Sequence, residues 1–161
     1  MTTPPAAPAP AVSLLPVRDL DFDELFRMFE VYCAEVEPLD PLGTPPESSD
    51  ERRDALLDGA SDEEWSWIIA DGQRAGFVMV QVYEDDPLPG DRTAEVLECY
   101  VAPEARRRGV GRAAIEAVLA DERGRGTTVM EAGILRANEG AIAFWEAMGF
   151  ATRSVQVARR L

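Results

Sequence analysis

The stretch "VLECYVAPEARRRGVGRAAIEAVLA", residues 96–120, places four arginines within seven residues and threads two glycines, Gly109 and Gly111, between them. The chain as a whole is acidic, with 30 Asp and Glu residues against 16 basic ones and a formal net charge of −14. A local concentration of guanidinium groups in such a chain favours an anionic ligand at this position. The pattern predicts a strand running into the stretch and a helix that begins at its glycines.

The chemistry of such a loop suits a phosphate group. The first N–H groups of a helix have no acceptor within the helix, and they carry roughly half a positive charge. Both glycines lack a Cβ atom, so the backbone can approach a ligand closely. The arginines add bidentate donors. Together these features predict a seat for a diphosphate, and the alternative is a solvated basic turn that only caps the helix.

The sequence "GVGRAA", residues 109–114, also fits the G-x-G-x-x-A fingerprint of dinucleotide-binding proteins, and Glu131 follows Gly111 by 20 residues. In that fold, however, the glycines directly follow the strand, whereas here residues 102–108 intervene. Only 50 residues follow Gly111, which is too few for the rest of a two-half nucleotide fold. Nicotinamide-dinucleotide binding therefore remains a minor alternative.

Two absences restrict the chemistry of the chain. It contains no histidine, which excludes histidine bases, Ser-His-Asp triads and histidine metal sites. It also contains no lysine, since all 16 basic residues are arginine, which removes Schiff-base chemistry. Proton transfer must therefore use carboxylates, tyrosine, cysteine or water, and we expect no metal centre. The acidic balance also disfavours binding to nucleic acid or to an anionic membrane.

The length of 161 residues suits one domain. We interpret residues 1–11, which are rich in proline and alanine, as a disordered leader and residues 12–161 as a single folded domain. The leader has no basic region and is broken by prolines, so it resembles neither a signal peptide nor a membrane span. Cys33 and Cys99 show no C-x-x-C spacing, which favours a reducing, cytoplasmic location.

Hydrophobic periodicity and turn signals divide the chain into alternating elements. The expected strands cover residues 12–17, 93–101, 127–135 and 151–159, with a hairpin over 64–84 that turns at "ADGQRAG", residues 70–76. The expected helices run from Asp19 or Asp21 to about Val36 and over residues 48–59, 109–124 and 138–150. This order indicates an α/β fold of the α+β type, rich in antiparallel neighbours.

Two motifs in the second half of the chain resemble the GNAT superfamily of acyl-CoA-dependent N-acetyltransferases. The phosphate motif [QR]-x-x-G-x-[GA] is matched by Arg106, Gly109 and Gly111. The later motif, an Asn, then a helix, then F-Y-x-x-x-G-F, is matched by Asn138, Phe144, Gly149 and Phe150. The resemblance covers about residues 95–150, and the N-terminal third of the chain carries no motif of its own.

The resemblance implies a mixed, mostly antiparallel central sheet flanked by helices, with two splayed strands that form a wedge for acetyl-CoA, the co-substrate. The strand at 98–101 would lie along the pantetheine arm, and an N–H near Cys99 would stabilise the oxyanion of a tetrahedral intermediate. The loop amides from Arg107 to Arg112 would hold the diphosphate. The expected cofactor-binding residues are Cys99, Tyr100, Val101, Arg106, Arg107, Arg108, Gly109, Val110, Gly111, Arg112, Asn138 and Trp145.

Acyl transfer to an amine needs a base, and two carboxylates on one strand, Glu95 and Glu98, are candidates. Glu95 aligns with the base of the histone-acetyltransferase branch, and Glu98 lies where many small bacterial members carry an acid. Because their separation is odd, we expect opposite faces of the strand, with Glu95 beside Cys99 and Glu98 beside Tyr100. Water alone is the third alternative for the base.

Trp145 departs from the family pattern, which usually has a tyrosine there as the general acid. An indole N–H is no practical acid, so solvent or another hydroxyl, Tyr100 or Tyr83, would protonate the leaving thiolate. Trp145 itself is then a packing residue. Cys99 invites a covalent mechanism, but no lysine or histidine is present to lower its pKa, and we interpret it as a buried, inert thiol.

The resemblance thus implies an N-acetyltransferase that moves an acetyl group from acetyl-CoA to a primary amine by direct attack. A small cationic amine is the expected acceptor, recruited by acidic side chains near the site: Glu35, Glu37, Asp40, Glu84, Asp85 and Asp86. The alternative is a catalytically weak acyl-CoA-binding module with a regulatory or interaction role, which Trp145 favours. Family members often form dimers, so the resemblance also suggests a homodimer.

Overall fold

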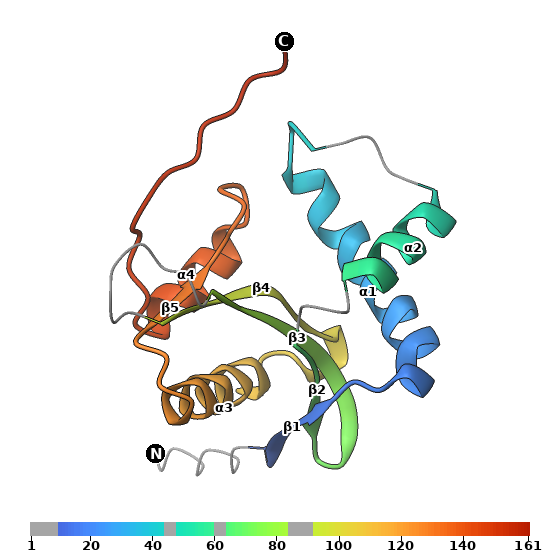
Figure 1. The fold of residues 1–161 in the computed structure, drawn as a ribbon, viewed down its shortest axis with the longest axis vertical. Coiled ribbons are helices and arrows are strands. Elements are labelled where there is room, and N and C mark those ends of the chain that lie inside the picture. Colours follow the sequence, from blue (N-terminus) through green and yellow to red (C-terminus); the bar gives the residue numbers. More distant parts are fainter. Residues whose placement is uncertain (1–9, 44–47, 60–63, 84–91) are drawn as a thin grey trace, which may run out of the picture.

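The computed structural model describes residues 10–43, 48–59, 64–83 and 92–161. Its described strands form one sheet in the order β1-β2-β3-β4-β5, in which only the β4–β5 pair is parallel (Figure 1). The elements in chain order are β1 (Val12–Pro16), α1 (Phe22–Val36), α2 (Ser49–Gly59), β2 (Glu64–Ala70), β3 (Gln73–Tyr83), β4 (Thr93–Val101), α3 (Val110–Gly124), β5 (Val129–Ala132) and α4 (Glu139–Ala147). The mixed, mostly antiparallel sheet is the architecture expected from the sequence.

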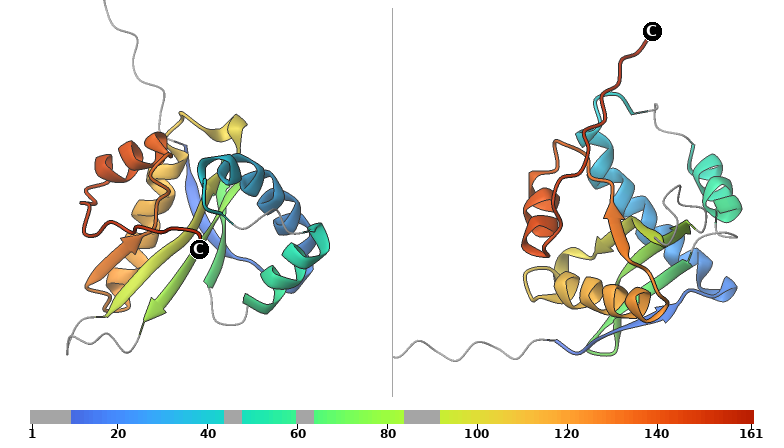
Figure 2. Two further views of the ribbon diagram at one scale, coloured as in Figure 1. Left: turned by 90° about the horizontal axis from the view of Figure 1, so that it is seen from above. Right: turned by 60° about the vertical axis from the view of Figure 1, so that its left-hand side comes forward.

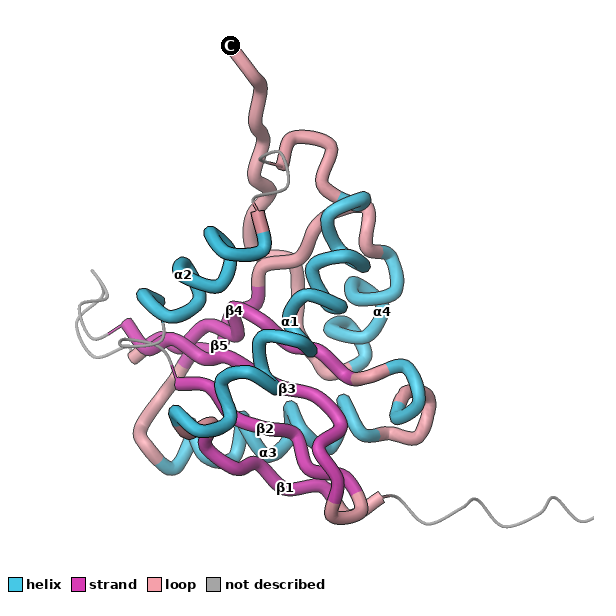
Figure 3. Tube along the Cα trace, turned by 90° about the vertical axis from the view of Figure 1, so that its right-hand side faces the viewer, coloured by secondary structure: helices cyan, strands magenta, loops and turns pink. Residues whose placement is uncertain are grey.

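The helices cover both faces of the sheet, with α1 and α2 on one face and α3 and α4 on the other (Figures 1 and 2). Seen from the side of α1 and α2, helix α1 crosses in front of the strands and α3 lies behind them (Figure 3). The core of the α1 face is aromatic and includes Trp65, Trp67, Phe77 and Tyr100. The core of the α3 face is mainly aliphatic, so the two layers differ in chemistry as well as position.

The hairpin between β2 and β3 turns where the sequence predicts it. Asp71 and Gly72 both have positive φ, 51° and 80°, as a type I′ turn requires. An Asp-Gly pair adopts this conformation at low cost, and its twist matches that of the flanking strands. The turn also holds the start of β1, because the Asp71 N–H donates to the Ala11 carbonyl at 3.0 Å.

A β-bulge in β4 shifts the faces of its side chains. Met79 pairs with Glu98 and Val80 pairs with Val96, so Leu97 has no partner on β3. The strand β4 thus has one more residue than β3 at this point. Residues on the two sides of Leu97 that are three positions apart therefore point to the same face of the sheet. As a result, Val96 and Cys99 both pack on the α3 face.

The edge of β4 is paired along only part of its length. Residues 93–96 pair with residues 129–132 of β5, whereas β4 continues to Val101 against β3. From Leu97 to Val101 the side of β4 that faces β5 has no strand partner among the described residues. The pairing of the two parallel strands thus ends at the bulge, and the remaining edge of β4 is open on this side, in line with the splayed strands that the resemblance implied.

The prediction of a final strand over residues 151–159 is wrong. Residues 151–161 form no strand or helix, and Val155 and Val157 are 72% and 89% exposed. A strand needs backbone partners as well as β-branched residues, and this segment makes none within the described chain. Two of its arginine side chains contact the body of the protein: Arg153 bonds to Glu131, and Arg160 bonds to the carbonyl of Gly43. The segment leaves the body beside α4 (Figure 1).

Residues 1–9 of the expected leader lie outside the described residues. No helix in the described ranges is both long enough and apolar enough to cross a lipid bilayer.

Candidate active site

The arginine–glycine loop lies between the end of β4 and the start of α3, after a short 3-10 turn, η3 (Pro103–Ala105). Arg107 and Gly109 have φ values of 61° and 82°. Left-handed residues that alternate with right-handed ones turn successive N–H groups toward one side and form an anion-binding nest. No N–H from Arg107 to Arg112 makes a regular hydrogen bond to a described residue. The loop therefore presents a set of unused donors at the N-terminus of α3.

Most of the arginine side chains in this loop already have partners. Arg108 donates to Asp71, in the hairpin turn, at 2.6 Å. Arg112 donates to the Ala147 carbonyl at 3.1 Å, at the end of α4. The guanidinium of Arg106 points toward α1 and contacts Glu35. Among the four, only Arg107 has no hydrogen bond or ion pair to a described residue, so it is the guanidinium most available to an anion.

Gly111 lies where α3, α4 and the free edge of β4 meet. A Cβ atom built at this glycine would lie 3.6 Å from the Phe144 ring and 3.6 Å from the Val101 side chain. These are ordinary contact distances, so the glycine leaves room for one methyl group and little more. The nest, the free edge of β4 and the second half of α4 thus converge at this point. Val101 contributes less than expected there, because its carbonyl already accepts from Arg106 Nε at 2.6 Å.

Glu98 is held by a tyrosine from α1. Tyr32 donates a short hydrogen bond from its hydroxyl to the Glu98 carboxylate. Its ring packs 5.8 Å from the rings of Phe77 and Tyr100. Burial and the charge of Glu98 raise the pKa of Tyr32, so the phenol stays protonated and remains a donor. Sequence analysis missed Tyr32, since α1 carries no motif and its aromatic residues indicate only a buried helix face.

Glu95 lies on the same face of β4 as Glu98, which corrects the expectation that the two carboxylates point in opposite directions. The strict alternation on which that expectation rested does not hold, because the bulge at Leu97 inserts an extra residue between them. Glu95 accepts a hydrogen bond from the Tyr83 hydroxyl at 2.9 Å. In the register of the β4–β5 ladder it lies opposite Glu131. The bulge therefore brings both candidate bases to the α1 side of the sheet.

The other expected site residues have structural contacts. Asn138 caps α4, since its Oδ1 accepts from the Ala141 N–H at 3.1 Å. Trp145 is 7% exposed and its ring packs edge-on against Phe144 and Phe150, at 5.4 and 4.8 Å. Trp145 thus packs in the core, which is the role expected for an indole that cannot act as an acid.

Tyr100 is 4% exposed, and burial raises its pKa. Its ring belongs to the aromatic core of the α1 face, which makes it a weak acid in a dry environment.

Cys99 packs against the α3-face core. Burial, and to a smaller extent the charge of Glu98, raises the pKa of its thiol to about 12. A thiol of this kind stays protonated near neutral pH and is a poor nucleophile. The same reasoning applies to Cys33, whose pKa burial raises to about 11. The geometry thus favours the inert interpretation of Cys99 over covalent transfer.

The three described acidic residues among those expected to recruit an acceptor already have partners. Glu35 contacts Arg106, Glu37 contacts Arg52 at 2.5 Å, and Asp40 accepts from the Leu42 N–H at 3.0 Å. Glu84, Asp85 and Asp86 lie outside the described residues.

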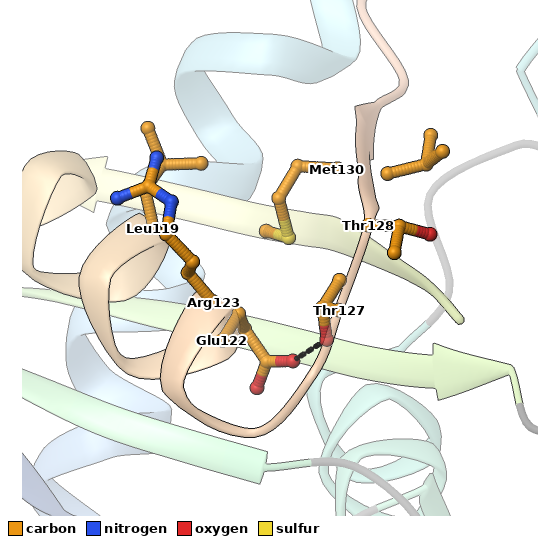
Figure 4. A pocket seen from close by; sticks show the side chains of 7 residues that line it. Leu119, Glu122, Arg123, Thr127, Thr128 and Met130 are labelled. Atoms are coloured by element: carbon orange, nitrogen blue, oxygen red, sulfur yellow. Dashed lines mark hydrogen bonds between the residues drawn. The ribbon is translucent and has the colours of Figure 1, made fainter. Parts of the chain in front are cut away.

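A separate pocket of about 140 Å³ lies at the far end of α3 from the arginine loop (Figure 4). Glu122, which is 3% exposed, lines it and accepts a hydrogen bond from the Thr127 hydroxyl at 2.5 Å. The Thr127 N–H also donates to the Glu122 carbonyl, at 2.9 Å. These bonds fix the turn between α3 and β5, so we assign the buried carboxylate a structural role. No group of three or more potential metal ligands occurs within the described ranges.

Solved structures of acetyltransferases share this fold. A ribosomal-protein-alanine N-acetyltransferase from Brucella melitensis biovar Abortus 2308 superposes with a TM-score of 0.72 at 23% identity, covering 94% of this chain and 100% of that one. A putative acetyl transferase from Pyrococcus furiosus gives a TM-score of 0.73 at 14% identity over 94% and 100%. An aminoglycoside acetyltransferase from an uncultured soil metagenomic sample, in complex with sisomicin, gives 0.67 at 14% identity over 93% and 96%. These likenesses concern the fold.

Sequence comparison gives the family. An uncharacterized N-acetyltransferase of Methanocaldococcus jannaschii is 31% identical over 84 residues, which are 52% of this chain and 37% of that protein. The match thus covers little more than a third of that relative's length. The sequence profile of the acetyltransferase (GNAT) family matches residues 25–150, from α1 to the residue after Gly149. The chain therefore belongs to the acetyltransferase (GNAT) family.

Proposed function

We propose that this protein is an N-acetyltransferase that transfers the acetyl group of acetyl-CoA to a primary amine. One observation carries the proposal. The N–H groups from Arg107 to Arg112 have no acceptor among the described residues, and they lie at the N-terminus of α3 beside the free edge of β4. Unused donors in a nest at a helix N-terminus fit a diphosphate. The residues present therefore fit the co-substrate that the family implies.

In this proposal the loop amides and Arg107 hold the diphosphate, and the pantetheine arm follows β4 from Leu97 to Val101. Acetyl-CoA supplies an activated acetyl group and a thiol leaving group. A backbone N–H near Cys99 is the proposed donor to the thioester oxygen, where negative charge develops. Asn138 keeps its capping role at the start of α4, the helix whose second half meets Gly111.

Glu98 is the proposed base. It lies on the strand that borders the cofactor, and Tyr32 holds its carboxylate from α1. A primary amine with a pKa near ~10 is mostly protonated at neutral pH, so it must lose a proton before it attacks. Glu95 is the second candidate on the same face. The nitrogen forms its bond to the acetyl carbon, the carbon–sulfur bond breaks, and water protonates the thiolate, because Trp145 is a core residue without an acidic proton.

The proposed acceptor is a cationic amine. The net charge of −14 would attract a cation and repel an acidic acceptor at low ionic strength. Two proteins of this fold carry names that state amine-bearing acceptors, an aminoglycoside and the alanine of a ribosomal protein.

The test is steady-state release of CoA thiol from acetyl-CoA in the presence of a panel of amines, with Glu98→Gln as the matched variant. Turnover with at least one cationic amine supports the proposal. The second candidate function, an acyl-CoA-binding module with little activity, rests on the buried Trp145 at the position of the usual acid. Tight binding of CoA without turnover of any amine would favour that module.

A further inference from the structure

The side chain of Arg106 occupies an unexpected place for a residue of the phosphate motif. Its Nη2 donates to both carboxylate oxygens of Glu35, at 3.0 and 2.8 Å. Its Nε donates to the Val101 carbonyl at 2.6 Å, and its guanidinium carbon lies 5.3 Å from the centre of the Tyr100 ring. One side chain thus contacts the end of β4, the aromatic core and helix α1.

These contacts use the donors that a phosphate would need. A guanidinium binds anions through its fork of N–H groups, and here the Nη2 and Nε groups both have partners. The N–H of Arg106 is also engaged, since it donates to the Pro103 carbonyl at 3.2 Å. The unused donors begin only at the next residue, Arg107. Arg106 is therefore the last residue of the loop whose backbone N–H and side chain are both held by hydrogen bonds within the protein.

Glu35 lies one helical turn from Tyr32 on α1, so both side chains reach from the same face of the helix. Tyr32 contacts the proposed base Glu98, and Glu35 contacts Arg106 at the start of the loop. Helix α1 is thus joined to the cofactor strand at two points along its length. Both joints lie on the side of the sheet that carries the candidate bases.

We infer that Arg106 is a positioning residue and not a diphosphate ligand: together with Glu35 it fixes α1 against the end of β4, and thereby places Tyr32 and Glu98 relative to the bound acetyl group. The inference rests on the proposed function. It requires that loss of Glu35 and loss of Arg106 have the same consequence, although the two side chains have opposite charges. A diphosphate ligand would give the contrary pattern, since removing Glu35 would release its guanidinium toward the anion.

The experiment compares Arg106→Ala, Glu35→Gln and the double variant in CoA binding by calorimetry and in steady-state kinetics with acetyl-CoA and a cationic amine. Arg107→Ala serves as the diphosphate-ligand reference. Arg125→Ala and Glu64→Gln provide a matched control pair, because Arg125 Nη1 also donates to both oxygens of Glu64, at 2.8 and 2.7 Å, away from the site. That control measures the effect of losing an exposed ion pair as such.

We expect both single variants to lower kcat, Glu35→Gln on the order of fivefold and Arg106→Ala by at least as much, because Arg106→Ala also removes the bond to the Val101 carbonyl. The double variant should lose no more than Arg106→Ala alone. Their CoA dissociation constants should stay within about threefold of the wild type, whereas Arg107→Ala should raise the constant about tenfold, because it removes a charged donor. The control pair should leave kcat unchanged. Arg106→Lys should not rescue kcat, because an ammonium cannot reach three partners at once.

Two results would overturn the inference, and they differ in meaning. Weaker CoA binding in Arg106→Ala, combined with unchanged or tighter binding in Glu35→Gln, would make Arg106 a diphosphate ligand and leave the proposed function intact. Absence of CoA binding by the wild type would overturn the proposed function, and the inference with it.

Discussion

Glu95 and Glu98 lie on the same face of β4, because the bulge at Leu97 adds one residue to the strand between them. Each carboxylate accepts a hydrogen bond from a tyrosine hydroxyl, Tyr83 for Glu95 and Tyr32 for Glu98. The two tyrosines come from different elements, β3 and α1. The site therefore has two similar carboxylate–phenol pairs, and their roles can be separated by matched substitutions.

We expect Glu98→Gln to lower kcat by about 10²-fold or more, the usual contribution of a general base, and Glu95→Gln to lower it much less. Tyr32→Phe removes one donor to Glu98 and keeps the ring in place. Hydrogen bonding favours the charged carboxylate, so this variant should shift the acidic limb of the pH profile of kcat/KM to higher pH. Tyr83→Phe should leave the limb in place. An unchanged profile in both Gln variants would exclude a carboxylate base.

A substitution at Gly76 would test how closely the backbones of β3 and β4 approach each other. A Cβ atom at this position would lie 1.9 Å from the Tyr100 carbonyl oxygen, a backbone atom that cannot move alone. We expect Gly76→Ala to cost at least about 2 kcal/mol of unfolding free energy, as overpacking does, measured by urea titration. Gly124→Ala is the control, since its Cβ would meet nothing within 4 Å. Equal stability of the two variants would show that the strands separate easily.

The two loop glycines should respond differently to substitution. Gly109 has φ of 82°, so Gly109→Ala should lose about 1 kcal/mol through backbone strain. Gly111→Ala should fold normally, because its methyl group makes ordinary contacts. Gly111→Leu would fill the space between Val101 and Phe144 and should weaken CoA binding in calorimetry, with Gly111→Ala as the size control. Unchanged affinity of Gly111→Leu would remove this junction from the binding site.

The raised pKa of the Cys99 thiol should lower the free energy of unfolding at alkaline pH. Its pKa is about 12 in the folded protein against an ordinary value of 9.0, so the unfolded chain releases this proton first. The stabilising contribution is complete below pH 9.0 and declines as the pH rises toward about 12. We expect the free energy of unfolding to fall between about pH 9 and about pH 12 more steeply in the wild type than in Cys99→Ala. Parallel curves would place the thiol in a solvated environment.

The C-terminal segment should exchange its amide hydrogens rapidly. Residues 151–161 donate no backbone hydrogen bond within the described chain, and Val155 and Val157 are exposed. Hydrogen exchange followed by mass spectrometry should show rates close to those of an unstructured peptide, with β3 as the protected reference. Strong protection of the segment at high protein concentration, lost on dilution, would show that it finds a strand partner in another molecule.

Local signals in the sequence were sufficient for most of the elements. The Asp-Gly pair at 71–72 fixed the hairpin, because few residues adopt positive φ so readily. Asn138 marked the start of α4 and does cap it. The glycines at 109 and 111 marked the start of α3, and alternation of apolar residues marked the strands. Each of these signals acts over a few residues, which is why sequence patterns capture it.

The features that sequence analysis missed depend on contacts between distant segments. The bulge at Leu97 arises from the pairing of β3 with β4, and no residue in the sequence indicates a bulge at this position. The contact of Tyr32 with Glu98 joins residues 66 positions apart, and that of Glu35 with Arg106 joins residues 71 positions apart. The failed strand at 151–159 has suitable composition but lacks a partner edge. Partner and register are properties of the assembled sheet, so a single sequence does not reveal them.

Every ion pair recorded in the described chain uses an arginine, as the absence of lysine requires. Guanidinium groups stay protonated and are very poor acyl acceptors, so none of these 161 residues offers a side-chain amine for self-modification. Radioactive label from the donor that appears on an added amine can thus be counted without an autoacetylated lysine background. The same composition leaves the network of surface charges unaffected by lysine-directed reagents.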